Sequence, residues 1–254
     1  MHPKPPLMRY EELSPPADLA AWVAAFWVFS VAADAGAIDH PIPLTGGAIL
    51  AMRPGEEPVV SGPRVRPLVV PVRGGEIHYG VHLLPGAAGP LLRHGAASLR
   101  EQVGPARMWL DPAWCESFRT AVDPAAHLLS SVRSLSAGAA APDPLIMRAV
   151  ARVMESDGAA PIGELSLASG LSPRQFRRRF TEAVGLAPKE LARLRRVRAS
   201  AAAAVVEGRS WAYAASEHGF ADQAHLVREF RSLLGPAPEE FRTHAERIAH
   251  RLVR

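Results

Sequence analysis

Hydrophobic and polar positions follow two different periods along this chain of 254 residues. Between residues 27 and 84, short apolar runs alternate with glycine and proline, a pattern typical of strands. The runs lie at residues 27–31, 48–52, 59–60, 68–72 and 77–84. Beyond residue 85, apolar residues recur every three or four positions, as they do in helices. The pattern therefore predicts a β-rich N-terminal half and a helical C-terminal half.

The N-terminal half offers more specific predictions. The prolines of residues 1–16 predict an extended arm. Residues 17–26 place Leu19, Trp22, Val23 and Phe26 at helical spacing, which predicts a short helix. The pair Gly74-Gly75 predicts a hairpin turn. We interpret these elements as a small β-barrel or β-sandwich.

Helices are expected next at residues 98–103, 112–121 and 124–135, the last two capped by Asp111 and Asp123. The small residues of 137–142 then form the clearest linker in the chain. We therefore predict an α+β protein with an N-terminal β-rich domain over 1–136, a linker over 137–143, and an all-α domain over 144–254.

A pattern of glycine, apolar and proline positions occurs twice between residues 162 and 242. The first copy contains Gly170, Phe176, Phe180, Gly185 and Pro188, and the second contains Gly219, Leu226, Phe230, Gly235 and Pro238. The offset is 50 residues from Phe176 onward but 49 at the leading glycine, so the second turn has one extra residue. Such a repeat indicates two copies of one supersecondary unit.

Each copy predicts a helix, a tight turn and a second helix. In the first copy, Ser172 and Pro173 are suited to the N-cap and first position of the second helix. Phe176 and Phe180 share one face of that helix, and arginines occupy the other positions. A buried aromatic face opposite a basic face favours a helix-turn-helix, and two copies in register favour it over a merely solvated hairpin.

The C-terminal motifs resemble a known family. The run GFADQAHLVREFR at residues 219–231, and the ending GPAPEEFR at residues 235–242, resemble the DNA-binding domain of AraC/XylS-type bacterial transcription regulators. The resemblance covers about residues 145–245 and implies two helix-turn-helix units joined by a linker helix. Segments 62–67 and 80–88 resemble an uncharacterised module often found ahead of such domains, which implies no particular ligand.

The resemblance also implies roles for individual residues. By their positions in the family motif, the residues expected to reach base edges are Arg174, Arg177 and Arg178 in the first unit, and Gln223, His225 and Arg228 in the second. Arg179 and Lys189 match positions better suited to phosphate contacts. Arg195 matches the buried arginine of the linker helix, for which a structural salt bridge is expected.

The charge of the chain is unevenly distributed. Residues 145–254 hold 18 Lys and Arg against 12 Asp and Glu, whereas residues 1–144 hold 11 against 13. The positive charge therefore lies on the segment that carries the repeated motif, as a double-stranded DNA partner requires.

Residue patterns typical of catalytic or metal-binding sites are weak in this sequence, so they support an enzyme less well than a DNA-binding protein. His78 and His82 lie on one face of a predicted strand but about 13 Å apart, too far to share a metal, and exposed strand histidines are expected instead. The single cysteine, Cys115, is expected to be a small buried residue near Trp109 and Trp114. We predict no catalytic residue, metal or cofactor. The alternatives are a barrel-bearing enzyme or a repair protein tethered to DNA.

The N-terminal domain is expected either to sense a small-molecule effector or to form a homodimer, and the sequence leaves both open. RNA polymerase is a further expected partner if the protein is an activator. The longest apolar run, residues 19–33, is too short to span a bilayer. We therefore expect no membrane partner and a cytoplasmic, nucleoid-associated protein.

Overall fold

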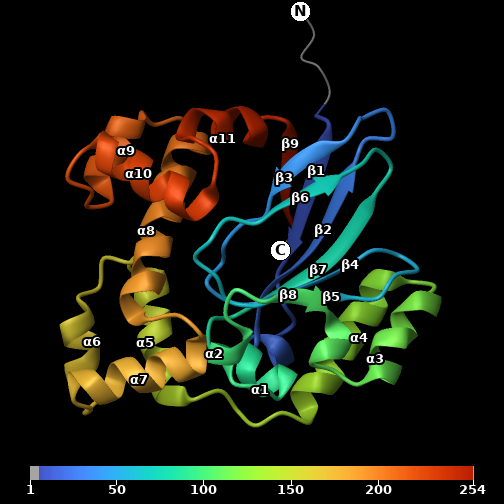
Figure 1. The fold of residues 1–254 in the computed structure, drawn as a ribbon, viewed down its shortest axis with the longest axis horizontal. Helices are drawn as coiled ribbons and strands as arrows, with labels where there is room; N and C mark the ends of the chain where they lie inside the picture. Colours follow the sequence, from blue (N-terminus) through green and yellow to red (C-terminus); the bar gives the residue numbers. More distant parts are fainter. Residues whose placement is uncertain (1–5, 254) are drawn as a thin grey trace, which may run out of the picture.

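The computed structural model describes residues 6–253, and the side chains up to residue 249. The chain forms a β-rich N-terminal part and a helical C-terminal part, which confirms the α+β class (Figure 1). The beginning of the predicted proline-rich arm lies outside the described residues. From residue 8 the arm is not free, because it forms the first strand of a sheet.

Two sheets make up the β-rich part of the described chain. The larger sheet has strands in the order β8-β5-β4-β7-β2-β1-β9, and the smaller pairs β3 with β6. The strands of the larger sheet are β1 (Met8–Leu13), β2 (Val23–Val31), β4 (Ile49–Met52), β5 (Val59–Ser61), β7 (Ile77–Leu83), β8 (Val103–Pro105) and β9 (Ile248–Val253). Those of the smaller sheet are β3 (Ile38–Pro41) and β6 (Val69–Val72). Neither sheet closes on itself within residues 6–253, so, of the barrel and the sandwich that were expected as alternatives, the closed barrel is not formed there.

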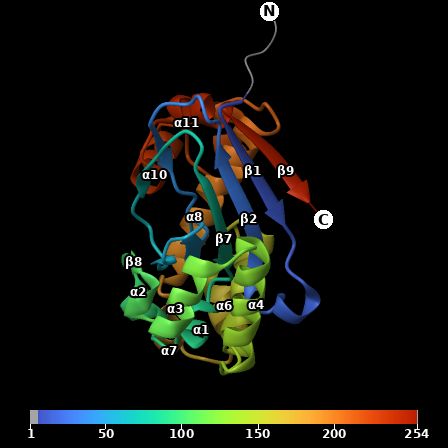
Figure 2. The same ribbon diagram turned by 90° about the vertical axis from the view of Figure 1, so that its right-hand side faces the viewer.

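Short helices cover one face of the larger sheet at the lower end of the molecule (Figure 2). They are α1 (Ala88–Leu92), α2 (Ala96–Leu99), α3 (Pro112–Glu116) and α4 (Pro124–Ala137), with single 3-10 turns at Ala17–Leu19, Ala106–Met108 and Ser117–Thr120. Their apolar side chains pack against Leu50 of β4 and Val81 of β7 to form the N-terminal core. Asp111 and Asp123 cap α3 and α4 as predicted, and Cys115 is buried in this core beside Trp109 and Trp114.

The helical part contains seven helices within the described residues. They are α5 (Pro144–Glu155), α6 (Ile162–Ala168), α7 (Pro173–Val184), α8 (Pro188–Val205), α9 (Trp211–Glu217), α10 (Gln223–Leu234) and α11 (Pro238–Ala245). The long helix α8 stands between two helical groups, with α5 to α7 at one end and α9 to α11 at the other (Figure 1). None of the helices in the described part of the chain combines the length and apolar composition needed to cross a bilayer.

Two local predictions for the N-terminal part were wrong. The expected helix over 17–26 is a single 3-10 turn, and Val23 to Phe26 belong to strand β2 instead. Strand β2 is apolar at nearly every position, so it also places apolar residues three and four apart, and this spacing was mistaken for a helical period. The turn at Gly74-Gly75 does not form a hairpin, because β6 pairs with β3 while β7 pairs with β2 and β4.

Two further differences concern residues 77–105. The helix expected at 98–103 is replaced by the short helix α2 and strand β8. The histidines of β7 are not exposed as expected. His82 is 7% exposed and His78 is half-buried, because this face of the sheet is covered rather than solvated.

The two parts of the chain share cores and a sheet. Leu44, from the loop after β3, is buried among the side chains of α8, α9 and α10. Strand β9, which follows α11, pairs in parallel with β1, and the sequence did not predict it. The first and last strands of the described chain thus lie side by side in one sheet, and this pairing joins the helical part to the β-rich part.

Candidate nucleic-acid interface

The first helix-turn-helix unit consists of α6, a turn over residues 169–172, and α7. Gly170 has a φ of 68°, a left-handed conformation that glycine adopts without strain, and it ends α6. Ser172 and Gln175 form a capping box at the start of α7. Phe176 and Phe180 are 1% and 0% exposed, with their ring centres 5.7 Å apart. The predicted caps and buried aromatic face therefore fix the orientation of α7.

The second unit repeats this arrangement with α9, a turn over residues 218–222, and α10. Its turn has five residues where the first has four, which is the extra residue indicated by the repeat offset. The side chain of Asp222 caps α10 by accepting a hydrogen bond from His225 N. Phe230 is fully buried and packs edge-on against Trp211 and Phe241.

The outer face of α7 presents three arginines to solvent. Arg174, Arg177 and Arg178 are all exposed, as expected for side chains that reach DNA. Arg178 lies 3.7 Å from Glu182 one turn along, and both side chains remain mostly exposed. Such a surface pair contributes about 0.3–0.5 kcal/mol, too little to hold the guanidinium away from a ligand.

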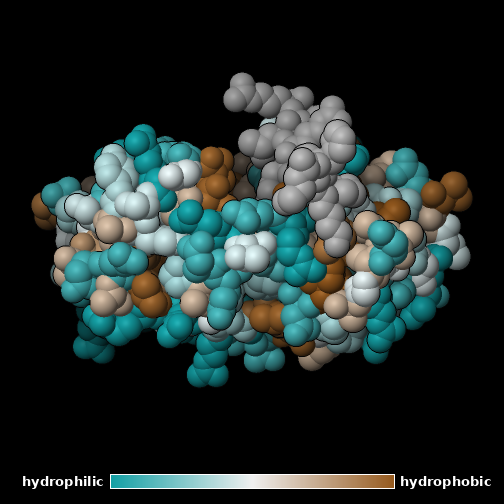
Figure 3. Space-filling view, turned by 90° about the horizontal axis from the view of Figure 1, so that it is seen from above, coloured by the Kyte–Doolittle hydropathy of each residue, from teal (hydrophilic) through white to brown (hydrophobic). Residues whose placement is uncertain are grey.

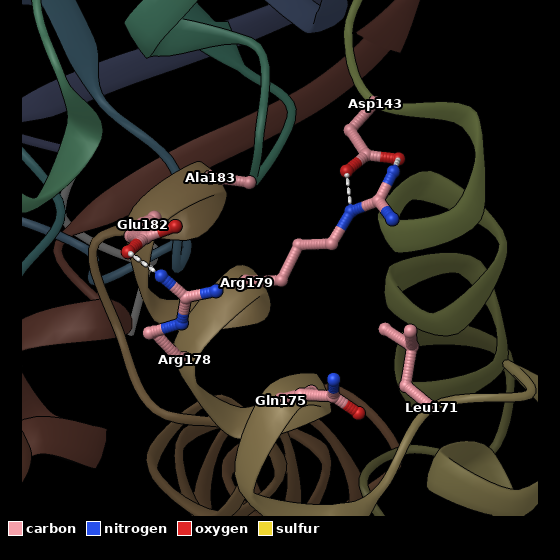
Figure 4. Close-up of a pocket in the computed structure, with 7 residues that line it drawn as sticks. All are labelled: Asp143, Leu171, Gln175, Arg178, Arg179, Glu182 and Ala183. Atoms are coloured by element: carbon pink, nitrogen blue, oxygen red, sulfur yellow. Dashed lines mark hydrogen bonds and ion pairs between the residues drawn. The ribbon is translucent and has the colours of Figure 1, made fainter.

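Arg179 is engaged differently (Figure 4). Its guanidinium donates to both carboxylate oxygens of Asp143, at 2.5 and 3.0 Å. Asp143 also caps α5 by accepting from Leu145 N and Ile146 N. Partial burial disfavours the Asp143 carboxylate, but the bonds from Arg179 and the backbone outweigh it and lower the pKa of Asp143. Arg179 therefore ties α7 to the start of α5 in this structure.

The outer face of α10 is less basic. Gln223 and Arg228 are exposed, and His225 is half-buried with its ring edge-on to Phe220. Ala221 N donates to His225 Nδ1 at 3.4 Å, so in the neutral ring the proton lies on Nε2. His225 thus offers a hydrogen-bond donor at its outer edge. Seen from above, the end of the molecule that carries α9 to α11 is mainly hydrophilic (Figure 3).

Lys189 is the second residue of α8 and is exposed. The structure thus places the four residues Arg174, Arg177, Arg178 and Lys189 on the exposed surface around α7 and the start of α8. Gln223, His225 and Arg228 of α10 lie toward the far end of α8. The predicted site residues therefore form two separate clusters, one at each end of α8 (Figure 1).

Helix α8 sets the separation of the clusters. Its 18 residues correspond to about 27 Å at 1.5 Å per residue. Arg195 bonds Asp157 at 2.6 Å, the structural salt bridge expected for the linker helix. Arg193 joins Glu229 and Ser232 of α10, a tie between linker and second unit that the sequence did not reveal.

A family model matches this part of the chain. It is described as a helix-turn-helix domain and covers residues 165–244, which run from within α6 to within α11 and include the linker helix. Residues 165–244 form an AraC-type helix-turn-helix domain. The chain therefore contains a helix-turn-helix domain at these residues. A second model, a domain of unknown function (DUF6597), matches residues 11–105 and confirms the uncharacterised N-terminal module.

Solved structures of AraC-type and related regulators are also similar to this chain. The C-terminal domain of AraT, a response regulator from Geobacillus stearothermophilus, is 17% identical over 40% of this chain and 85% of its own, with a TM-score of 0.37. The DNA-binding domain of AdpA, solved with a target DNA, is 28% identical over 40% of this chain and 91% of its own, with a TM-score of 0.36.

Over nearly the full length, ToxT from Vibrio cholerae is 11% identical, covering 93% of this chain and 96% of its own, with a TM-score of 0.43. A comparison with curated proteins gave no match.

A cavity of about 700 Å³ lies behind the AraC-type domain, between the two sheets and α8. Its walls are mostly apolar and aromatic, and include Trp27 of β2 and Phe29 of the same strand. Arg195 and Arg198 of α8 reach it from the helical side. This cavity could not be predicted from local sequence patterns, because its lining comes from strands and a helix that lie far apart along the chain. No group of three or more His, Cys, Asp or Glu among the described residues could hold a metal ion.

Proposed function

We propose that this protein is a sequence-specific transcription regulator that binds double-stranded DNA through both helix-turn-helix units. The observation that carries the proposal is the repeated geometry. Each unit buries an aromatic face of its second helix and leaves exposed, on the opposite face, side chains able to read bases. In the proposed complex α7 and α10 enter successive major grooves on one face of the duplex.

The length of the linker helix fits this mode of binding. Successive major grooves on one face are separated by one helical turn, about 34 Å. The length of α8, about 27 Å, is of the same order, since α7 and α10 extend beyond its ends. The operator is therefore expected to contain two half-elements whose centres lie about 10–10.5 bp apart.

The two recognition helices are expected to read different bases. Arginine forks onto guanine O6 and N7, so the three arginines of α7 favour a G·C-rich half-element. On α10, Gln223 suits adenine and Arg228 suits guanine. His225 offers a single donor from Nε2. Ala224 and Val227, beside these residues, favour apolar contact such as with a thymine methyl.

Lys189 and Arg179 are assigned to phosphates. Lys189 is exposed at the start of α8 and needs no rearrangement. Arg179 would have to release one of its two bonds to Asp143, and its remaining donors would then face the backbone of the duplex. Arg179 is thus expected to contribute less than Lys189.

The N-terminal half is proposed to sense a small molecule in the cavity. The support is that α8, which spaces the two units, supplies side chains to the cavity wall. A ligand that shifts α8 would change the spacing of α7 and α10. Homodimerisation through the N-terminal half is the alternative to sensing. The proposal also includes the domain division at 137–143, contact with RNA polymerase if the outcome is activation, and a cytoplasmic, nucleoid-associated location.

Selection of binding sites from a random duplex library by the full-length protein tests the proposal. A bipartite motif with the spacing above is expected, with an affinity that falls steeply as salt increases, because basic side chains displace phosphate counterions. Failure to enrich any motif, or an affinity that does not change between low and physiological salt, would contradict sequence-specific DNA binding.

A further inference from the structure

The loop between β5 and β6 contains a short segment, residues 62–67, that lies against both helix-turn-helix units. A Cβ on Gly185, the residue that ends α7, would lie 3.1 Å from Cγ of Pro63. A Cβ on Gly235, the residue that ends α10, would lie 3.2 Å from Cβ of Pro67. Gly185 and Gly235 hold equivalent positions in the repeat, 50 residues apart. Two prolines of one segment therefore approach the same point of each unit.

The two glycines make this approach possible. Gly185 has a φ of 81° and Gly235 a φ of 94°, both in the left-handed region that glycine adopts without strain. Each donates its backbone N–H back into its own helix, Gly185 to the carbonyl of Thr181 and Gly235 to that of Arg231. Because neither carries a side chain, a proline ring can pack against the end of each recognition helix.

Val65 lies between the two prolines and contacts both C-terminal cores. It is partly buried and packs against the core of the first unit, which contains Phe176 and Phe180. It also packs against the core of the second unit, which contains Phe230 and Leu233. The segment thus contacts each unit at its core as well as at the end of its second helix.

Glu101 holds the segment in place from the β-rich part. Its backbone N–H donates to the carbonyl of Pro63 at 3.0 Å, and its Oε1 accepts from Val65 N at 2.8 Å. Its Oε2 lies 3.5 Å from Nη2 of Arg64, and both side chains are mostly buried. Three separate contacts to one residue leave the segment little freedom to move on its own.

The neighbouring residue, Arg100, connects this anchor to the first unit. Its guanidinium donates to both carboxylate oxygens of Glu190, at the start of α8, at 2.8 Å each. Helix α2, which precedes Arg100, lies beside the end of α7 (Figure 1). The first unit is therefore fixed to the β-rich part, and segment 62–67 extends that fixed surface to the second unit.

A contact of this kind restrains what the linker helix leaves free. Helix α8 separates the two units along its own axis, but a contact to both units from the side also restrains how they are turned relative to one another. DNA is sensitive to both quantities. Each added base pair moves a half-element about 3.4 Å along the duplex and turns it about 35° around the axis.

We propose that segment 62–67 fixes the relative orientation of α7 and α10, so that the N-terminal half determines which spacing of operator half-elements the protein accepts. Pro63, Val65 and Pro67 are positioning residues that act through the two recognition helices. The inference rests on the proposed binding of DNA through both units and names the element that sets its spacing specificity.

The first test measures the affinity of the full-length protein for duplexes in which the two selected half-elements are moved apart by 0, 1 or 2 bp. Two added base pairs should weaken binding of the unchanged protein about tenfold or more, because one unit loses its base contacts. In Val65→Ala and Pro67→Ala this penalty should fall by about threefold or more. A merely structural role would weaken binding at every spacing alike and leave the penalty unchanged.

Matched controls isolate the contact. Val69→Ala shortens a nearby valine that is 46% exposed and lies in neither C-terminal core. Gly235→Ala adds a methyl group against Pro67 and should lower the penalty, whereas Gly75→Ala, at a similar φ of 83° but with nothing within 4 Å of its Cβ, should not. Val65→Ile, which keeps a branched apolar side chain, should retain most of the spacing penalty.

The second test needs no DNA. Spin labels on Glu182→Cys of α7 and Arg231→Cys of α10, in a Cys115→Ala background, report the distance between the two recognition helices by double electron–electron resonance. The distance distribution should be narrow with Val65 in place and clearly broader in Val65→Ala and Pro67→Ala. Thermal unfolding of each variant confirms that it remains folded.

An equally narrow distribution in the Val65 and Pro67 variants, or an unchanged spacing penalty, would overturn the proposed role of the segment. Tighter binding of these variants at every spacing would also overturn it, because the segment would then restrain binding instead of positioning the helices. A protein that selects no operator would refute the proposed function, while the distance measurement would still test the inference.

Discussion

Replacing Arg178 by alanine tests whether α7 reads bases. A bidentate arginine–guanine contact contributes about 1–3 kcal/mol of discrimination. In the free protein, Arg178 gives up only an exposed pair with Glu182, 3.7 Å away, worth about 0.3–0.5 kcal/mol. The net loss on DNA is therefore about 0.5–2.7 kcal/mol, so the dissociation constant of the selected operator should rise about 2- to 90-fold.

The assay combines fluorescence anisotropy on the selected operator with a new selection by the variant. Arg178→Ala should lose its preference at one base step and keep the rest of the motif. Arg152→Ala is the matched control, because Arg152 forms a similar exposed pair with Glu155 on α5, away from the recognition helices. Uniformly weaker binding with an unchanged motif would show that Arg178 contacts phosphate, and the assignment of α7 as a base reader would be refuted.

Three further predictions concern stability. Phe180→Ala should lower the free energy of unfolding in urea by about 3–5 kcal/mol, because it empties a fully buried site, and a loss below about 1 kcal/mol would contradict this packing. Arg179 lowers the pKa of Asp143, so the stabilising effect of Asp143 is present above about pH 4 and is lost as the pH falls through the folded-state pKa. Asp143→Asn, which keeps the cap, should therefore weaken the dependence of the unfolding free energy on pH over that range. An unchanged pH dependence would rule this effect out. Arg100, in the β-rich part, donates two hydrogen bonds of 2.8 Å to Glu190 in the helical part. Both side chains are about one-third exposed, so a double-mutant cycle with Arg100→Met and Glu190→Gln should give a coupling energy of about 1 kcal/mol. A coupling energy near zero would show that this pair does not stabilise the contact between the two parts.

The sequence was most informative where structure is local. Ser172, Phe176 and Phe180 lie within three turns of one helix, and their spacing alone predicts the cap and the buried face of α7. Because the same pattern occurs twice, it also predicts the second helix-turn-helix unit. The change of offset from 49 to 50 residues predicts the longer second turn. The exposed positions of Arg174 and Arg177 could be predicted in the same way.

Long-range structure was the part that escaped prediction. The path of residues 17–26 depends on pairing of β2 with both β1 and β7, which no local pattern contains. The cavity depends on Arg198 meeting Leu44, 154 residues away in sequence. The close fit of Gly185 against the carbonyl of Ala96, where a Cβ would lie 2.7 Å from the oxygen, is likewise visible only once the two parts are packed together.

The parallel pairing of β1 with β9 has a consequence for synthesis. Met8 is aligned with Ile248, so the outer edge of β1 can be covered only after about 240 more residues have been made. At about 5–20 residues per second this takes roughly 10–50 s, during which β1 presents open backbone hydrogen-bonding groups. A nascent chain of this protein is therefore vulnerable to edge-to-edge association for that interval, and binding of a chaperone to residues 8–13 would be most useful before β9 emerges.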